Sequence, residues 1–163
     1  MRIFMASPLG FAESTRPLLP LLCEKLRHAG YEPVNPWDAS RDLEMALRQA
    51  ETTVDSTQRR HELHAVSMQI AERNASLLRS CDGVLAVLDG CDVDSGTASE
   101  IGYAFGLGGR IIHGYRGDFG QSGENDGVRI NLQVEYWIER SGGIIVRSIE
   151  DIPTLSFEST PTR

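Results

Sequence analysis

The chain is poor in the features that mark secreted, metal-binding or membrane-spanning proteins. It has only three cysteines, Cys23, Cys81 and Cys91, an odd number without a Cys-x-x-Cys spacing. This argues against a disulfide framework and against a structural zinc site. No apolar run approaches the roughly 20 residues needed to cross a bilayer, and the N-terminus lacks a signal-peptide pattern. We therefore predict a cytoplasmic protein with reduced thiols and no membrane partner.

Basic residues are also in deficit. The chain has 16 Lys+Arg against 23 Asp+Glu, for a formal net charge of −7. Nucleic-acid binding depends largely on neutralising phosphates with Lys and Arg, so this balance disfavours a DNA or RNA partner. The His61-Glu-Leu-His64 segment is one residue short of the zinc-protease spacing that places two histidines on one helical face. We expect a small-molecule ligand and no metal.

What is present fits one α/β domain. The 163 residues are 40% hydrophobic and 24% charged, which is typical of a globular protein. Short apolar segments alternate with amphipathic ones, so we predict strands at 2–6, 31–36, 84–88, 110–115 and 142–146, and helices at 17–29, 58–80 and 131–138. This alternation predicts a single-domain three-layer sandwich with a five-stranded, mostly parallel sheet and flavodoxin-like strand order.

Two segments interrupt the regular alternation. Residues 38–59 are polar with a short amphipathic stretch, which we interpret as a mobile excursion carrying a short helix and able to act as a lid. The domain proper is expected to cover residues 1–152. The tail, 153–163, has little periodicity, and we expect it to be ordered only by packing on a partner subunit.

Carboxylates concentrate where the apolar run 84–88 ends. Asp89, Asp92, Asp94 and Glu100 lie within twelve residues, ahead of and inside the first turn of a predicted helix of small residues. Parallel α/β sheets bind ligands beyond the carboxyl ends of their strands. A pair of carboxylates there suits glycosyl chemistry, in which one attacks or stabilises the anomeric carbon and the other handles the leaving group's proton.

Two of these residues also have structural interpretations. Thr97-Ala-Ser-Glu100 fits a capping box, in which Thr97 caps the helix and Glu100 reaches back to a backbone amide, and spacing alone favours this interpretation. Asn74 falls on the apolar stripe of the helix at 58–80. A buried amide must be hydrogen-bonded, so Asn74 either ties down a neighbouring loop, the commoner case, or faces a ligand.

Four ordered blocks resemble the nucleoside 2-deoxyribosyltransferase family over roughly the first 140 residues. They are Ile3-Phe-Met-Ala-Ser-Pro8, Cys81-Asp-Gly-Val-Leu-Ala-Val87, Asp94-Ser-Gly-Thr-Ala-Ser-Glu100-Ile-Gly-Tyr-Ala104 and Asn131-Leu132. The resemblance implies transfer of a 2-deoxyribosyl group between nucleobases, without cofactor or metal. It also implies a homo-oligomer, a dimer or hexamer, whose sites are completed by neighbouring subunits.

The resemblance also implies roles for individual residues. Glu100 would be the nucleophile that forms a covalent deoxyribosyl-enzyme, and Asp94 would bind the base and move its proton. Asn131, from the same or the adjacent subunit, would bind the 5′ side of the sugar. The remaining expected substrate-binding residues are Phe4, Ser7, Pro8, Asn74 and Gly96. A helix N-terminus favours an ionised carboxylate, so we expect Glu100 to be charged at neutral pH and Asp94 to carry the proton.

Three positions depart from the family pattern. Phe4 replaces a tyrosine whose hydroxyl touches the nucleophile in some members, and Asn74 replaces an aspartate linked to proton transfer. The tail lacks the tyrosine-containing ending that closes the site in some members. Two alternatives stay open: an N-glycoside hydrolase of nucleoside 5′-monophosphates, with phosphate donors in the loop that contains Ser7 and Arg16, and a non-catalytic nucleotide-binding module.

Overall fold

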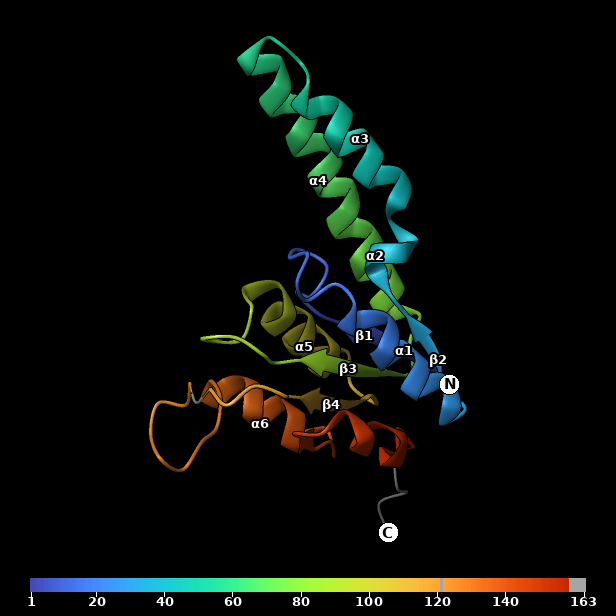
Figure 1. Cartoon of the computed structure of the whole chain (residues 1–163), viewed down its shortest axis with the longest axis vertical. Helices are drawn as coiled ribbons and strands as arrows, with labels where there is room; N and C mark the ends of the chain where they lie inside the picture. The colour runs from blue at the N-terminus through green and yellow to red at the C-terminus, as the bar shows by residue number, and fades with distance from the viewer. Residues whose placement is uncertain (121, 159–163) are drawn as a thin grey trace.

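Five parallel strands form the central sheet, in the order β2-β1-β3-β4-β5. The computed structural model describes residues 1–120 and 122–158 (Figure 1). The strands are β1 (Arg2–Ala6), β2 (Glu32–Val34), β3 (Gly83–Val87), β4 (Ile111–Tyr115) and β5 (Ile145–Val146). All four neighbouring pairs are parallel, so the predicted α/β sheet and its flavodoxin-like order are confirmed.

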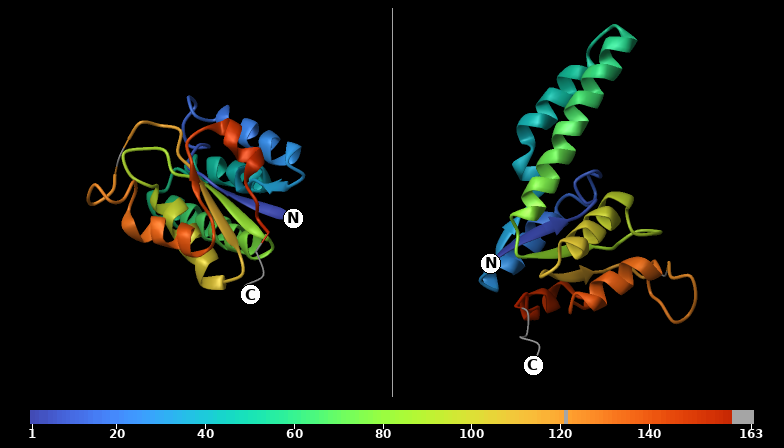
Figure 2. Two further views of the ribbon diagram at one scale, coloured as in Figure 1. Left: turned by 90° about the horizontal axis from the view of Figure 1, so that it is seen from below. Right: turned by 180° about the vertical axis from the view of Figure 1, so that it is seen from behind.

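Helices cover both faces of the sheet (Figure 2, left). One core lies under α1 (Leu18–His28) and the 3-10 helix η1 (Ile149–Thr154), and the other under α5 (Ser95–Leu107), α6 (Leu132–Arg140) and the end of α4 (Ser56–Arg79). The central strands are consequently buried on both sides, as their unbroken apolar runs predict. The strand order changes direction between β1 and β3, which creates a crevice at their carboxyl ends.

A helical hairpin rises away from the sheet (Figure 1). Its first arm comprises α2 (Pro36–Ala39) and α3 (Arg41–Glu51), and its second arm is α4. The segment predicted as a polar excursion is therefore mostly helix, because α3 buries Leu43 and Ala50 against α4. An ion pair between Arg73 and Asp42 joins the two arms. Asp55 caps α4 through the amides of residues 57 and 58, which moves the helix start two residues ahead of the predicted one.

The C-terminal segment packs on the chain's own core. Leu155 and Phe157 are buried, and Phe157 packs edge-to-face on Tyr31. His113 Nε2 lies 2.9 Å from the carbonyl oxygen of Ser156. The expectation that the tail needs a partner subunit for order is therefore wrong for residues 153–158, while residues 159–163 lie outside the described part. Phe157 lies near Met1, at the amino ends of the strands and away from the crevice.

Candidate active site

A cavity of about 270 Å³ occupies the crevice at the carboxyl ends of β1 and β3. The loop after β1 and the start of α5 form one side, and the base of the hairpin forms the other. The wall is mainly apolar. The lining residues are Ser7, Phe11, Pro36, Trp37, Ser40, Glu44, Leu47, Ile70, Asn74, Asp94, Gly96, Thr97 and Glu100.

Asp94 is fixed by the helix it precedes. It is the N-cap of α5, and its Oδ2 accepts hydrogen bonds from the Thr97 amide at 2.9 Å and from Thr97 Oγ1 at 3.3 Å. The capping-box interpretation is therefore wrong, since Thr97 lies three residues inside the helix. Glu100 lies in the second turn, not the first, beyond reach of the free amides. The carboxylate that caps the helix is that of Asp94.

Glu100 is the electrostatically perturbed group of the site. Burial in the apolar wall, and secondarily the charge of Asp94, raises its pKa from 4.5 to about 7. Among the described residues, none donates a hydrogen bond to its carboxylate. The expectation that Glu100 is charged at neutral pH therefore does not hold for the empty site: a pKa of about 7 leaves the protonated form populated there. The helix N-terminus is too distant to offset the burial.

Two residues that line the cavity each have a buried polar atom without a hydrogen-bond partner among the described residues. These atoms are Asn74 Oδ1 on α4 and Ser40 Oγ between α2 and α3. Leaving a buried polar atom unsatisfied costs about 1–3 kcal/mol. Of the two interpretations of Asn74, the structure favours the ligand-facing one, because its carbonyl oxygen ties down no loop.

Aromatic rings border the same cavity. Phe11 and Trp37 pack edge-to-face with centroids 4.6 Å apart, and Phe11 remains 76% exposed. Trp37 Nε1 donates to the Ser7 carbonyl at 3.2 Å, which ties the first loop to the hairpin. Sequence reasoning missed Trp37, Ser40 and Glu44. The available signal was Asn35-Pro-Trp: Asn35 caps α2, and a tryptophan beside that cap in a polar segment indicates a buried contact.

The structure brings together five of the eight predicted site residues. Those that line the cavity are Ser7, Asn74, Asp94, Gly96 and Glu100. Phe4 is wholly buried in the sheet core, and Pro8 is absent from the cavity lining. Asn131 lies elsewhere on the chain, where it caps α6 and donates from Nδ2 to Glu124 at 3.0 Å. Its own chain therefore does not place it at this cavity.

Neither a metal centre nor a membrane span is found in the described ranges. No group of three or more His, Cys, Asp or Glu side chains in residues 1–120 and 122–158 is arranged to hold a metal ion. None of the helices there combines the length and apolar character needed to cross a bilayer.

A doubly wound parallel sheet with a cavity at its switch point, lined by Asp94 and Glu100 of α5 among other residues, defines an α/β protein with a small-molecule site. Residues 3–133 match the family model described as Nucleoside 2-deoxyribosyltransferase, so the chain belongs to this family. No match is found among curated protein sequences.

Solved structures share the fold. A conserved protein from Enterococcus faecalis V583 has 23% identity and a TM-score of 0.68, with 94% of this chain and 95% of that chain covered. A 2-deoxyribosyltransferase from Bacillus psychrosaccharolyticus has 20% identity and a TM-score of 0.64, covering 96% and 93%. A CMP N-glycosidase from Clostridium botulinum has 16% identity and a TM-score of 0.53, covering 94% and 96%.

Proposed function

We propose that this protein is a nucleoside 2-deoxyribosyltransferase that exchanges the nucleobase of 2′-deoxyribonucleosides through a covalent intermediate on Glu100. The observation that carries the proposal is the pair of carboxylates at the start of α5, Asp94 and Glu100, in one mainly apolar cavity. Family membership supplies the reaction class. The expected setting is cytoplasmic nucleoside salvage.

The two carboxylates divide the chemistry between them. A carboxylate oxygen of Glu100 attacks the anomeric carbon, and the N-glycosidic bond breaks with its electron pair passing to the base nitrogen. A proton on Asp94 neutralises the departing base. A nitrogen of the incoming base then attacks the same carbon and displaces Glu100, while the N–H proton of that base passes to Asp94; the result is net retention with both carboxyl groups restored.

The protonation of Glu100 in the empty site is compatible with these two roles. A proton held on Glu100 must leave before this residue can attack, and the neighbouring Asp94 is the acceptor in the same cavity. Transfer from Glu100 to Asp94 on substrate binding would produce the nucleophile and the acid in one step. No external acid or cofactor is required.

The charges around the cavity support a nucleoside over a nucleotide. Its lining includes the carboxylates of Glu44, Asp94 and Glu100 and no Lys, Arg or His. A 5′-phosphate would meet Asp94 and the partly ionised Glu100 there, and Glu44 already pairs with Arg48, whose Nη2 lies 2.7 Å from its Oε1.

Hydrogen bonds within the first loop point the same way. Ser7 Oγ accepts from the Leu9 amide at 3.1 Å, Thr15 Oγ1 donates to the Leu9 carbonyl at 2.9 Å, and Arg16 donates to the Gly10 carbonyl at 3.3 Å. The hydroxyl proton of Thr15 and one amino group of Arg16 are therefore engaged within the loop itself, while Ser7 Oγ accepts there and keeps its own O–H to donate.

We assign the base to the end of the cavity formed by Asn74 and Ser40. A nucleobase edge carries donors and acceptors that complement an amide and a hydroxyl, which would satisfy both free atoms. Neighbouring subunits of a homo-oligomer, a dimer or hexamer, would complete the site. In that assembly Asn131 serves the sugar of an adjacent cavity, and Ser7 and Gly96 lie along the substrate.

Base exchange between deoxyinosine and free adenine tests the proposal. The expected product is deoxyadenosine, and Glu100→Gln should reduce its formation by at least about 10³-fold, since the nucleophile is removed. Glu139→Gln on α6, at an exposed position, is the matched control and should retain full activity. Free deoxyribose without deoxyadenosine would identify a hydrolase. Unchanged exchange in Glu100→Gln would refute the assignment of the nucleophile.

A further inference from the structure

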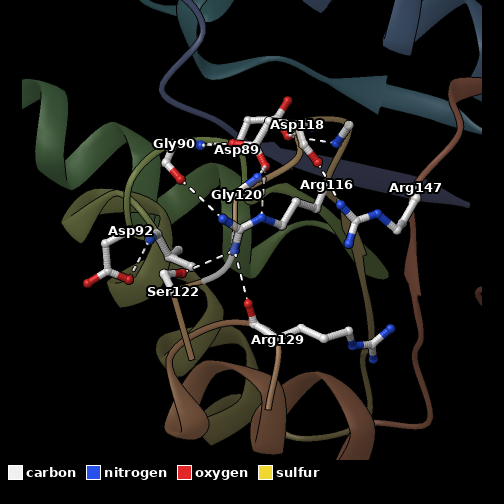
Figure 3. Close-up of polar contacts among 11 residues, drawn as sticks. Asp89, Gly90, Asp92, Arg116, Asp118, Gly120, Ser122, Arg129 and Arg147 are labelled. Atoms are coloured by element: carbon white, nitrogen blue, oxygen red, sulfur yellow. Dashed lines mark hydrogen bonds and ion pairs between the residues drawn. The ribbon is translucent and has the colours of Figure 1, made fainter. Parts of the chain in front are cut away.

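Arg116 is a buried cation outside the cavity, at the end of β4. Its side chain is only 1% exposed. The guanidinium donates from Nε to Asp118 Oδ1 at 3.0 Å, from Nη1 to Ser122 Oγ at 3.1 Å and to the Arg129 carbonyl at 3.3 Å, and from Nη2 to the Gly90 carbonyl at 3.2 Å (Figure 3). One side chain therefore joins the turn after β3 to three points of the loop before α6.

Gly90 is held on both sides of its main chain. Its carbonyl accepts from Arg116, and its amide donates to Asp118 Oδ2 at 2.7 Å (Figure 3). Asp89, the preceding residue, accepts from the amides of Gly117 at 2.6 Å and Asp118 at 3.0 Å. The first two residues of the turn are thus tied to the β4–α6 loop through four hydrogen bonds.

This turn ends at the catalytic pair. Three residues separate Gly90 from Asp94, and one of them, Val93, is buried. Asp94 is at once the last residue of the turn and the cap of α5. The path of residues 89–93, together with the cap on α5, therefore sets where the Asp94 carboxylate enters the cavity.

We propose that Arg116 is a positioning residue for the catalytic pair: by clamping Gly90 together with Asp118, it fixes the turn that delivers Asp94 beside Glu100. Arginine suits this task because its planar guanidinium holds several acceptors in fixed directions, whereas a lysine ammonium would keep the charge without that geometry. The kinetic consequences rest on the proposed base exchange, while the placement of Asp94 does not.

Moving the Asp94 carboxylate would change the pKa of Glu100. The charged groups around the cavity are Asp94 and Glu100 from α5 and Glu44 from α3, which pairs with Arg48; no Lys, Arg or His of the described residues is in the lining itself. The charge of Asp94 contributes to the raised pKa of Glu100, after burial. If the turn moves Asp94 away, that pKa falls. A purely structural role for Arg116 would lower thermal stability without moving this titration.

The experiment titrates Glu100 in the full chain labelled with ¹³C at glutamate carboxyls, with Glu100→Gln identifying the signal. Arg116→Lys is compared with a control variant, Arg147→Lys. The Arg147 side chain donates to the Asp118 carbonyl at 2.7 Å but makes no described hydrogen bond to the turn. We expect the titration of Glu100 to move to lower pH in Arg116→Lys only. Exchange should lose about 10- to 100-fold in kcat, the scale of a misplacement near 1 Å, with little change in KM.

Gly90→Ala perturbs the same turn without altering the buried charge. Gly90 has a φ of +130°, which strains any residue with a side chain. Gly90→Ala should lower the pKa of Glu100 in the same way as Arg116→Lys. This second variant keeps the proposal testable if Arg116→Lys folds poorly. A Glu100 titration and kcat unchanged in both variants would overturn the positioning role. A wild-type protein without base exchange, but with the titration shift present, would refute the proposed function alone.

Discussion

Replacing Glu100 by glutamine should stabilise the protein at alkaline pH and leave its stability unchanged at acid pH. Burial, with the charge of Asp94, raises the pKa of this carboxyl from 4.5 to about 7. Between these values the unfolded chain has released the proton while the folded chain retains it. The folded state then binds more protons, so stability falls as pH rises through this window.

The magnitude follows from the two pKa values. Each pH interval of one corresponds to 1.36 kcal/mol, so the full cost of ionising Glu100 in the folded protein is about 3 kcal/mol above pH 7. Glutamine has nearly the same shape and never ionises. The variant should therefore exceed the wild type by up to about 3 kcal/mol at pH 8.5 and match it at pH 4.5. Relaxation of the cavity and entry of water would reduce the gain.

Urea denaturation at fixed protein concentration, from pH 4.5 to 8.5, measures this difference. With a denaturant slope of about 2 kcal/mol/M, the midpoint of Glu100→Gln should lie on the order of 1 M above that of the wild type at pH 8.5. Glu139→Gln, at an exposed position on α6, should show no such pH-dependent gap. A stability difference for Glu100→Gln that stays constant from pH 4.5 to 8.5 would refute the reasoning.

Three further perturbations probe the cavity and the sheet. Asn74→Asp adds a carboxylate to the lining and should raise the pKa of Glu100, moving the rise of kcat to higher pH; an unchanged pH profile would remove Asn74 from the reaction zone. Ser40→Ala removes an unpartnered buried hydroxyl and should stabilise the empty protein by about 1 kcal/mol while raising KM, measured by thermal melts and exchange kinetics; loss of stability with unchanged KM would contradict this. Gly143→Ala would place a methyl carbon against the main chain of β4 and should lower the free energy of unfolding by more than about 2 kcal/mol. In Gly106→Ala, on α5, the added methyl carbon meets nothing within 4 Å, so this variant should be neutral or stabilising. Equal melting temperatures of the two variants would refute the contrast.

The sheet was predictable because each strand has a local signature. Unbroken apolar runs of four to six residues locate the two central strands, and glycines with polar residues mark their ends. The boundary of α5 was less determined. Asp94 and Thr97 both satisfy the rules for an N-cap, and only the helical geometry of Ser95 and Gly96 decides between them.

The cavity was predictable only on the side formed by the sheet. Ser7 and Asp94 follow strands whose carboxyl ends must meet, so their proximity follows from strand order. Trp37, Ser40 and Glu44 reach the same cavity through the packing of the hairpin, a long-range contact without periodicity in the sequence. The raised pKa of Glu100 likewise depends on that packing, because burial is its main cause and residues of the hairpin line the same cavity.

The length of the hairpin means that a small tilt of α4 near the cavity corresponds to a larger movement at the tip. Asn74 lies five residues from the end of α4 at Arg79, whereas Asp55 precedes the opposite end, 24 residues away. At 1.5 Å per residue these distances are about 8 and 36 Å. A tilt of α4 about its sheet-proximal end that moves Asn74 by about 1 Å would move the tip by about 5 Å. Spectroscopic labels at Val54, which is 95% exposed at that tip, would therefore amplify small changes in cavity width into a measurable displacement.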